Sequence, residues 1–273
     1  MKPQFFDIHS HINFVAFDED REDVLKKTAE EETWLINVGT QKDTSAKALE
    51  IARSFSQGVY ATVGLHPIHT GESYHDKKEL GDEGKEFVSR GEEFDFEYYK
   101  NLAQDEKVVA IGECGLDYYR LDKNSVARQK SEFEKQINLA NEVNKPLMLH
   151  IRNAYKDAFD ILKSTAKVKG NVHFFAGNWE EAKMFLDFGF TISFTGVVTF
   201  ARNYDDVIKN APLDMMLSET DAPYVTPVPH RGKRNESLYV KEVVKKIAEI
   251  RGGDYEKVRG AMVFNAMRVF GLL

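Results

Sequence analysis

Histidines and acidic residues recur at the ends of short apolar runs along this chain. His9 and His11 lie two residues apart in FFDIHSHI, so their imidazoles share one face if this run is a strand. Such a pair is a natural chelate, because neutral imidazole is the commonest metal-binding side chain. Two histidines satisfied in a core or on a surface explain the pair equally well, so the other runs must decide.

Residues of the same chemical kind follow other apolar runs: His66, Glu113, His150, His173 and Asp221. Buried imidazoles and carboxylates are costly without partners, whereas divalent cations compensate all of them at once. The sequence therefore predicts a metal centre, with His66 nearby, built from His9, His11, Glu113, His150, His173 and Asp221.

The number of candidate ligands favours two ions. Four histidines and two carboxylates exceed what one tetrahedral catalytic zinc with an open position needs. A carboxylate such as Glu113 can bridge two cations about 3.5–4 Å apart, an arrangement used for in-line phosphoryl displacement. The mixed nitrogen and oxygen set suits Zn²⁺, Mn²⁺ or Mg²⁺, and the sequence leaves that choice open.

Cationic residues near these runs are candidates for binding phosphate. Arg231, Lys233 and Arg234 cluster in VTPVPHRGKRNES, after the run that contains Asp221, and Arg152 follows His150 by two residues. A phosphate-bearing substrate would require cations beside a metal centre. An ordinary solvated loop accounts for the cluster equally well, and Arg152 is equally suited to supporting a carboxylate.

Apolar and β-branched runs alternate with segments of helical periodicity. Strands are expected at 5–12, 33–40, 59–67, 108–117, 146–152, 171–177, 190–198 and 215–223, and clear helices at 125–144, 238–252 and 254–272. Eight strand–helix units predict an α/β fold of the TIM (β/α)8 barrel type, with an extra C-terminal helix packed outside the barrel. The C-terminal mouth of such a barrel would gather the candidate ligands.

The bulk composition fits one domain over residues 1–273. A hydrophobic content of 42% supplies a barrel core, and no apolar run approaches the length of a membrane span. The N-terminus does not resemble a signal peptide, and the single Cys114 suits a reducing compartment, so we expect a cytoplasmic protein without a membrane partner, monomeric or a small homo-oligomer. A net charge of −7 argues against coating duplex nucleic acid, but not against gripping one strand end.

Several motifs together resemble those of the TatD family of metal-dependent deoxyribonucleases, in the same order. They are D-x-H-x-H at 7–11, GLHP at 64–67, GECGLDYY at 112–119, P-x-x-x-H-x-R at 146–152, G-x-x-T-F at 196–200, ETDAPY at 219–224 and RGKRNE at 231–236. Any one of these motifs is weak evidence, whereas the combination is specific.

The resemblance implies a metal-dependent hydrolase that cleaves DNA phosphodiester bonds, as a 3′–5′ exonuclease on single strands. One metal ion would be held by His9, His11, Glu113 and Asp221. The other would be held by Glu113, His150 and His173, with His66 beside the scissile phosphate. In the mechanism that we expect, the two ions activate a water molecule, and Asp221 orients it and accepts its proton.

The chain departs from the family pattern in two places. Phe174 and Ala176 stand where the family commonly has a cysteine and a hydroxyl residue, and such changes around a ligand can alter metal affinity about 10–100-fold. The polar stretch 68–94 is longer than the usual connection, and is interpreted as a solvated excursion or as a gate over the mouth.

Two other functions remain open. A different dimetal barrel hydrolase, such as an aminoacyl-tRNA deacylase, an amidohydrolase or a lactonase, would use the same fold. Many amidohydrolases bridge their metals with a modified lysine where this chain has Glu113, which favours the nuclease. A non-enzymatic binding factor predicts a damaged ligand set, and all six positions are filled. The sequence leaves open the choice between DNA and RNA, and between exonuclease and endonuclease action.

Overall fold

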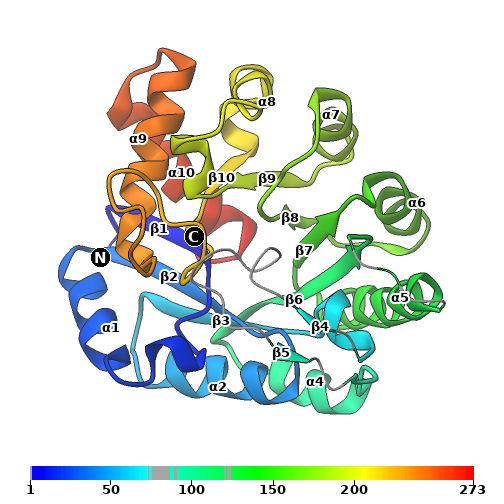
Figure 1. Ribbon diagram of the computed structural model, residues 1–273. Helices are drawn as coiled ribbons and strands as arrows, with labels where there is room; N and C mark the ends of the chain where they lie inside the picture. Colours follow the sequence, from blue (N-terminus) through cyan, green and yellow to red (C-terminus); the bar gives the residue numbers. More distant parts are fainter. Residues whose placement is uncertain (1, 73, 76–86, 89–90, 120, 122–123) are drawn as a thin grey trace.

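Eight parallel strands form one sheet in the computed structural model, which describes residues 2–72, 74–75, 87–88, 91–119, 121 and 124–273 (Figure 1). Their order around the sheet is β1-β2-β3-β6-β7-β8-β9-β10, and every pairing is parallel. The strands are β1 (Phe5–Ser10), β2 (Thr33–Val38), β3 (Val59–Val63), β6 (Val108–Asp117), β7 (Leu147–Arg152), β8 (Gly170–Val172), β9 (Thr191–Phe194) and β10 (Met216–Ser218). The expected (β/α)8 barrel is therefore confirmed.

The sheet closes where the chain leaves β1 and β10. Ser10 forms a parallel bridge with Ala222, and the backbone N–H of His11 donates to the carbonyl of Ala222 at 2.7 Å. The N–H of Asp221 donates in turn to the carbonyl of His9 at 2.8 Å. Closure of the barrel thus brings candidate ligands from the two ends of the sequence together.

Helices alternate with the strands and surround the sheet (Figure 1). They are α1 (Arg21–Glu30), α2 (Lys42–Arg53), α4 (Phe96–Ala103), α5 (Ser125–Val143), α6 (Tyr155–Thr165), α7 (Trp179–Asp187), α8 (Asp205–Asn210) and α9 (Val240–Arg251). Val240, Val243 and Ile247 of α9 are buried at helical spacing, as the periodicity predicts. Short 3₁₀ turns are Val15–Phe17, Pro67–Thr70, Gly196–Thr199, Leu213–Met215 and Ser237–Tyr239.

The expected extra C-terminal helix is confirmed as α10 (Tyr255–Val269), and it packs across the bottom of the barrel. Its buried Met267, with Phe270 just beyond the helix, joins the cluster of residues that fills the barrel interior, including Phe6 and Ile36. The Asn265 amide donates to the carbonyl of Met216, at the start of β10, at 2.9 Å. Since strands begin at this end, α10 covers the bottom of the barrel, opposite the mouth.

The polar stretch 68–94 is described only in part. Strand β4 (Tyr74–His75) pairs antiparallel with β5 (Phe87–Val88). Residues 73, 76–86 and 89–90 lie outside the described residues, and with them most of the segment expected to be an excursion or a gate. Within the described part of the chain, the structure has no helix long and apolar enough to cross a membrane.

Candidate metal centre

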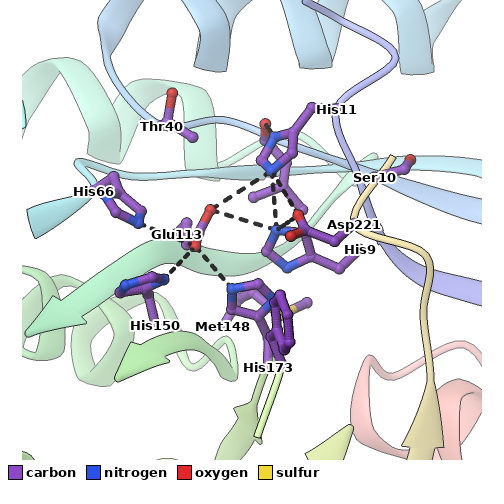
Figure 2. Close-up of polar contacts among 12 residues, drawn as sticks. His9, Ser10, His11, Thr40, His66, Glu113, Met148, His150, His173 and Asp221 are labelled. Atoms are coloured by element: carbon purple, nitrogen blue, oxygen red, sulfur yellow. Dashed lines mark hydrogen bonds and ion pairs between the residues drawn. The ribbon is translucent and has the colours of Figure 1, made fainter. Parts of the chain in front are cut away.

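The seven imidazole and carboxylate residues singled out in the sequence meet at the C-terminal mouth of the barrel (Figure 2). His9, Glu113 and His150 lie within β1, β6 and β7. The others follow strands directly or within a few residues: His11, His66, His173 and Asp221. Except for the half-buried His150 and Asp221, all are buried.

Glu113 is the centre of this cluster, and its two carboxylate oxygens face different imidazoles. Oε1 lies 2.9 Å from Nε2 of His173 and 3.1 Å from Nδ1 of His150. Oε2 lies 3.4 Å from Nε2 of His9 and 3.8 Å from Nε2 of His11. One carboxylate therefore joins two groups of nitrogen atoms.

A second carboxylate completes one of these groups. The Nε2 atoms of His9 and His11 lie 3.2 Å apart, and Oδ1 of Asp221 lies 3.8 and 3.4 Å from them respectively. The His9 and His173 rings are stacked with centroids 3.7 Å apart, so the two groups are in direct contact. Candidate metal-holding groups among the described residues are His9 with Glu113 and His173, His9 with His11 and Asp221, and His66 with Glu113 and His150.

An irregularity in β6 presents Glu113 to the mouth. The pairing register with β7 shifts between Ile111 and Cys114, so the strand bulges at the ligand. Gly112 has φ 151°. A Cβ at that position would lie 2.4 Å from the carbonyl oxygen of Met148, so a side chain would force the two strands apart.

Two further carboxylates, not singled out in the sequence, lie beside one nitrogen each of His150 and His173. Oδ2 of Asp117 lies 2.9 Å from Nε2 of His150, and Oε1 of Glu219 lies 3.4 Å from Nδ1 of His173. Glu219 is itself fixed by the Ser193 hydroxyl, which donates at 2.8 Å. Both acids stand inside the motifs GECGLDYY and ETDAPY, and their position near strand ends was the signal available in the sequence.

Asp7, which was also not assigned a role from the sequence, forms hydrogen bonds beneath the mouth of the barrel. Its carboxylate accepts hydrogen bonds from the Thr220 N–H at 2.8 Å and the Thr220 hydroxyl at 2.6 Å. The N–H of His9 donates to it at 3.3 Å. Complete burial raises the pKa of Asp7 to about 7 although these hydrogen bonds lower it. Asp7 therefore links β1 to the segment that carries Asp221.

The two departures from the family pattern affect side chains whose backbones make contacts here. The N–H of Phe174 donates to Oε1 of Glu219 at 2.6 Å, and the N–H of Ala176 donates to the Tyr155 hydroxyl at 3.0 Å. Since backbone groups make these two contacts, neither contact depends on the identity of the side chain at 174 or 176.

Electrostatics favour ionised carboxylates at the centre. Burial opposes the charge of Glu113, but the neighbouring His66, His173 and His9 hold its pKa well below the usual value. Burial likewise opposes the charge on His150, yet Asp117 and Glu113 raise its pKa to about 8. The ionised carboxylates thus favour positive charge among the neighbouring imidazoles.

The donor set fits a divalent cation. Nδ1 of His11 lies 3.1 Å from the carbonyl oxygen of Val38, which can only accept, so this nitrogen carries the proton and Nε2 offers a lone pair. Asp117 selects the Nε2–H tautomer of His150 in the same way, which turns the lone pair of Nδ1 toward Glu113. Lone pairs that face a carboxylate oxygen need a cation or a proton between them, and mixed nitrogen and oxygen ligands suit Zn²⁺, Mn²⁺ or Mg²⁺.

His66 differs from His11 and His150 because its protonated nitrogen faces the centre. Its Nδ1 accepts a hydrogen bond from the N–H of Ile68 at 3.2 Å, so Nε2 carries the proton of the neutral ring. Burial and the neighbouring His150 lower the pKa of His66 to about 4. The ring is therefore neutral near pH 7, and its Nε2–H points toward the centre, 3.3 Å from Oε1 of Glu113.

The four cationic side chains expected to bind phosphate differ in their contacts. The Arg234 guanidinium forms an ion pair with the Asp20 carboxylate, with hydrogen bonds of 2.8 and 2.6 Å. Lys233 is exposed. Arg231 stacks on the Phe200 ring at 4.2 Å, and Arg152 on the Tyr119 ring at 3.6 Å. Arg152, Arg231 and Lys233 therefore remain on the rim of the mouth, whereas Arg234 ties the loop after β10 to the loop after β1.

A barrel whose strand ends gather buried histidines around carboxylates has the architecture of a metal-dependent hydrolase. The family model described as TatD related DNase matches residues 6–271. The chain is 38% identical to the uncharacterised metal-dependent hydrolase YabD of Bacillus subtilis (strain 168), over 97% of this chain and 98% of that protein. It is 31% identical to the 3′-5′ ssDNA/RNA exonuclease TatD of Pantoea ananatis, over 98% of this chain and all of the relative.

A solved structure agrees with these sequence relatives. YjjV, a TatD homologue from Escherichia coli K12, superposes with a TM-score of 0.83 at 27% identity, and each chain is covered completely. The chain belongs to the TatD family of metal-dependent hydrolases.

Proposed function

We propose that residues 1–273 act as one domain that hydrolyses DNA phosphodiester bonds with two divalent cations, as a 3′–5′ exonuclease on single strands. The observation that carries the proposal is the position of Glu113, whose two oxygens face separate groups of imidazoles. A carboxylate in this position can bridge two cations, the arrangement suited to in-line displacement at phosphorus.

The ligands divide between two positions in this proposal. One ion would be held by His9, His11, Glu113 and Asp221, and the other by Glu113, His150 and His173. Asp117 and Glu219 would orient His150 and His173 through the nitrogens that face away from the ions. His66 would not be a ligand, because its Nε2 carries a proton.

When bound, divalent cations supply Lewis acidity, which lowers the pKa of a water nucleophile and stabilises charge on phosphoryl oxygens. Asp221 is suited to align that water and accept its proton, because its carboxylate is held ionised beside His11 although burial opposes the charge. The Nε2–H of His66 is suited to donate a hydrogen bond to a phosphoryl oxygen, where negative charge grows during attack.

The rim of the mouth would bind the rest of the strand. Arg152, Arg231 and Lys233 provide positive charge for flanking phosphates, whereas Arg234 acts as a structural residue because Asp20 occupies its guanidinium. Nucleic acid as the substrate class is supported by the similarity to the Pantoea ananatis exonuclease. A cytoplasmic location remains part of the proposal, because the free Cys114 suits a reducing compartment.

The experiment is mononucleotide release from 3′-labelled and 5′-labelled single-stranded DNA. Metal-stripped protein would be assayed with Mg²⁺, Mn²⁺ or Zn²⁺, beside Glu113→Ala and the control Glu249→Ala on the outer face of α9. The proposal predicts release from the 3′ end that returns with metal, is lost in Glu113→Ala and persists in the control. Intact DNA with every metal would reject the nuclease and leave an ester or amide hydrolase on the same site.

A further inference from the structure

Large apolar side chains that are exposed in the described part of the chain gather around the mouth. Of eight such residues, five follow the carboxyl ends of strands: Val15, Tyr119, Leu121, Phe200 and Val228. Scattered surface apolar residues need no explanation, but a group that encircles a candidate site marks a surface for binding.

Two of these residues are aromatic, and each carries a guanidinium over its ring. Tyr119 is 41% exposed with Arg152 at 3.6 Å from its ring centroid, and Phe200 is 44% exposed with Arg231 at 4.2 Å. Among the residues that the structure describes, neither guanidinium forms an ion pair with a carboxylate. Each pair therefore offers a flat, cationic, partly exposed platform.

Short hydrogen bonds join the Tyr119–Arg152 pair to the candidate metal centre, and another joins the two segments that carry Phe200 and Arg231. The N–H of Tyr119 donates to Asp117 at 2.8 Å, and Asp117 also holds His150. Arg152 lies two residues beyond His150 in the same strand, β7. On the other arc of the rim, the loop that carries Arg231 is joined to the turn before Phe200 by the Val228 N–H, which donates to the Thr199 hydroxyl at 2.9 Å.

We propose that the Tyr119–Arg152 and Phe200–Arg231 pairs are two stacking subsites for unpaired nucleobases of a single-stranded nucleic acid. This inference deepens the proposed function and rests on it. Nucleobases stack on aromatic rings and on guanidinium planes whatever their sequence, while the positive charge of the arginines attracts the adjacent phosphates. Bases within a duplex have no free faces, so such platforms select single strands.

The test measures binding with hydrolysis blocked. Full-length Glu113→Gln protein would be titrated by fluorescence anisotropy with a labelled dA12 strand, with an abasic 12-mer that carries the same phosphates, and with the matching duplex. Tyr119→Ala and Phe200→Ala would be combined with Glu113→Gln, and Phe264→Ala serves as the matched control because Phe264 is 51% exposed on α10, far from the mouth.

We expect each of the two mouth substitutions to weaken dA12 binding about 5- to 150-fold, the range for losing one base–aromatic stack. Binding of the abasic strand is expected to be weaker at the outset and to change little in either variant. Phe264→Ala should leave dA12 binding unchanged, and Tyr119→Phe should restore it. Equal binding of dA12 and the abasic strand, binding of duplex as tight as of single strand, or no loss in either variant would overturn the inference.

A separate assay distinguishes this failure from failure of the proposed function. Wild-type protein with added metal would be tested for hydrolysis of bis(4-nitrophenyl) phosphate, a diester without bases. Hydrolysis without base-dependent binding of dA12 would overturn the stacking subsites alone. Base-dependent binding without hydrolysis of either the diester or DNA would support the subsites and reject the catalytic proposal.

Discussion

Oδ2 of Asp117 lies 2.9 Å from Nε2 of His150, and this contact determines which nitrogen of that imidazole faces Glu113. The two residues lie on neighbouring strands, β6 and β7, where Asp117 pairs in register with Arg152, two residues beyond His150. A carboxylate at Nε2 keeps the proton there and leaves Nδ1 as the ligand atom. The orientation of the candidate ligand His150 thus depends on Asp117, which is not itself a candidate ligand.

Replacing Asp117 should weaken metal binding without removing a ligand. In Asp117→Asn the amide no longer carries charge and can rotate to offer a donor, so His150 loses its preferred tautomer. We expect metal affinity to fall about 10–100-fold. Calorimetric titration of metal-free protein with Mn²⁺ measures the change. Asp160→Asn, an equivalent change on the exposed face of α6, should bind like wild type, and equal affinities for both variants would contradict the assigned role.

Arg231 and Arg234 should differ in their contribution to nucleic-acid binding, although both belong to the same basic loop. Arg231→Ala removes a rim cation, so the slope of log K against log salt for single strands should fall by about 0.7. Arg234→Ala should leave that slope unchanged, because Asp20 occupies Arg234, and should instead lower stability by about 0.5–1 kcal/mol. Binding titrations over a salt series and chemical denaturation separate the two. Identical slopes for both variants would reject the distinction.

The thiol of Cys114 should be inert in the folded protein. Complete burial raises the pKa of Cys114 above its ordinary value, with the charge of Glu113 contributing in the same direction. A raised pKa leaves less thiolate at any given pH, and thiolate is the reactive form. We expect no reaction with Ellman's reagent at pH 8 until denaturant is added, after which one thiol per chain reacts. Rapid labelling of native protein would show that β6 opens beside Glu113.

Because α10 and the residues just after it pack against the barrel on one side only, substitutions there should lower the free energy of unfolding by unequal amounts. Phe270 is buried with the barrel interior, so Phe270→Ala should lower the free energy of unfolding by about 3–5 kcal/mol. Phe264→Ala on the exposed side of the same helix should change it by no more than about 0.5 kcal/mol. Urea denaturation of the two variants provides the comparison. Similar losses would contradict a helix that closes the bottom of the barrel.

This helix illustrates what sequence reasoning could and could not supply. Apolar periodicity located α10 within a few residues, because periodicity reports that one face is buried. It does not report which surface covers that face, and residues such as Met267 fit the outside and the bottom of a barrel equally well. Only the three-dimensional contact with Phe6 and Ile36 decides between the two.

The strands show a related limit. The runs expected as strands at 171–177 and 215–223 contain His173 and Asp221, but β8 ends at Val172 and β10 at Ser218. The chain leaves regular structure beyond each strand, with positive φ at Phe174 and Asp221. Apolar residues continue beyond β8 at 174–176, so composition alone overextends that strand, whereas the polar Glu219, Thr220 and Asp221 follow β10 directly.

The candidate metal ligands were easier to recognise in the sequence than the residues that hold them in place. Histidines and acids at strand ends could be recognised by type and spacing, because the mouth of a barrel collects them. Asp117 and Glu219 could not be assigned roles, because each acts on one nitrogen of a ring whose orientation the sequence does not encode. The engagement of Arg234 by Asp20 likewise depends on two loops that meet only in the closed barrel.

Whether Glu113 joins two metal positions can be measured as the number of metal ions bound per chain. Metal-free protein would be reconstituted with Mn²⁺ or Zn²⁺, freed of excess ion and analysed by inductively coupled plasma mass spectrometry. A bridging Glu113 predicts two ions per chain in the wild type and a loss of binding at both positions in Glu113→Ala. A single ion in the wild type, or two ions retained in the variant, would contradict a bridging role for Glu113.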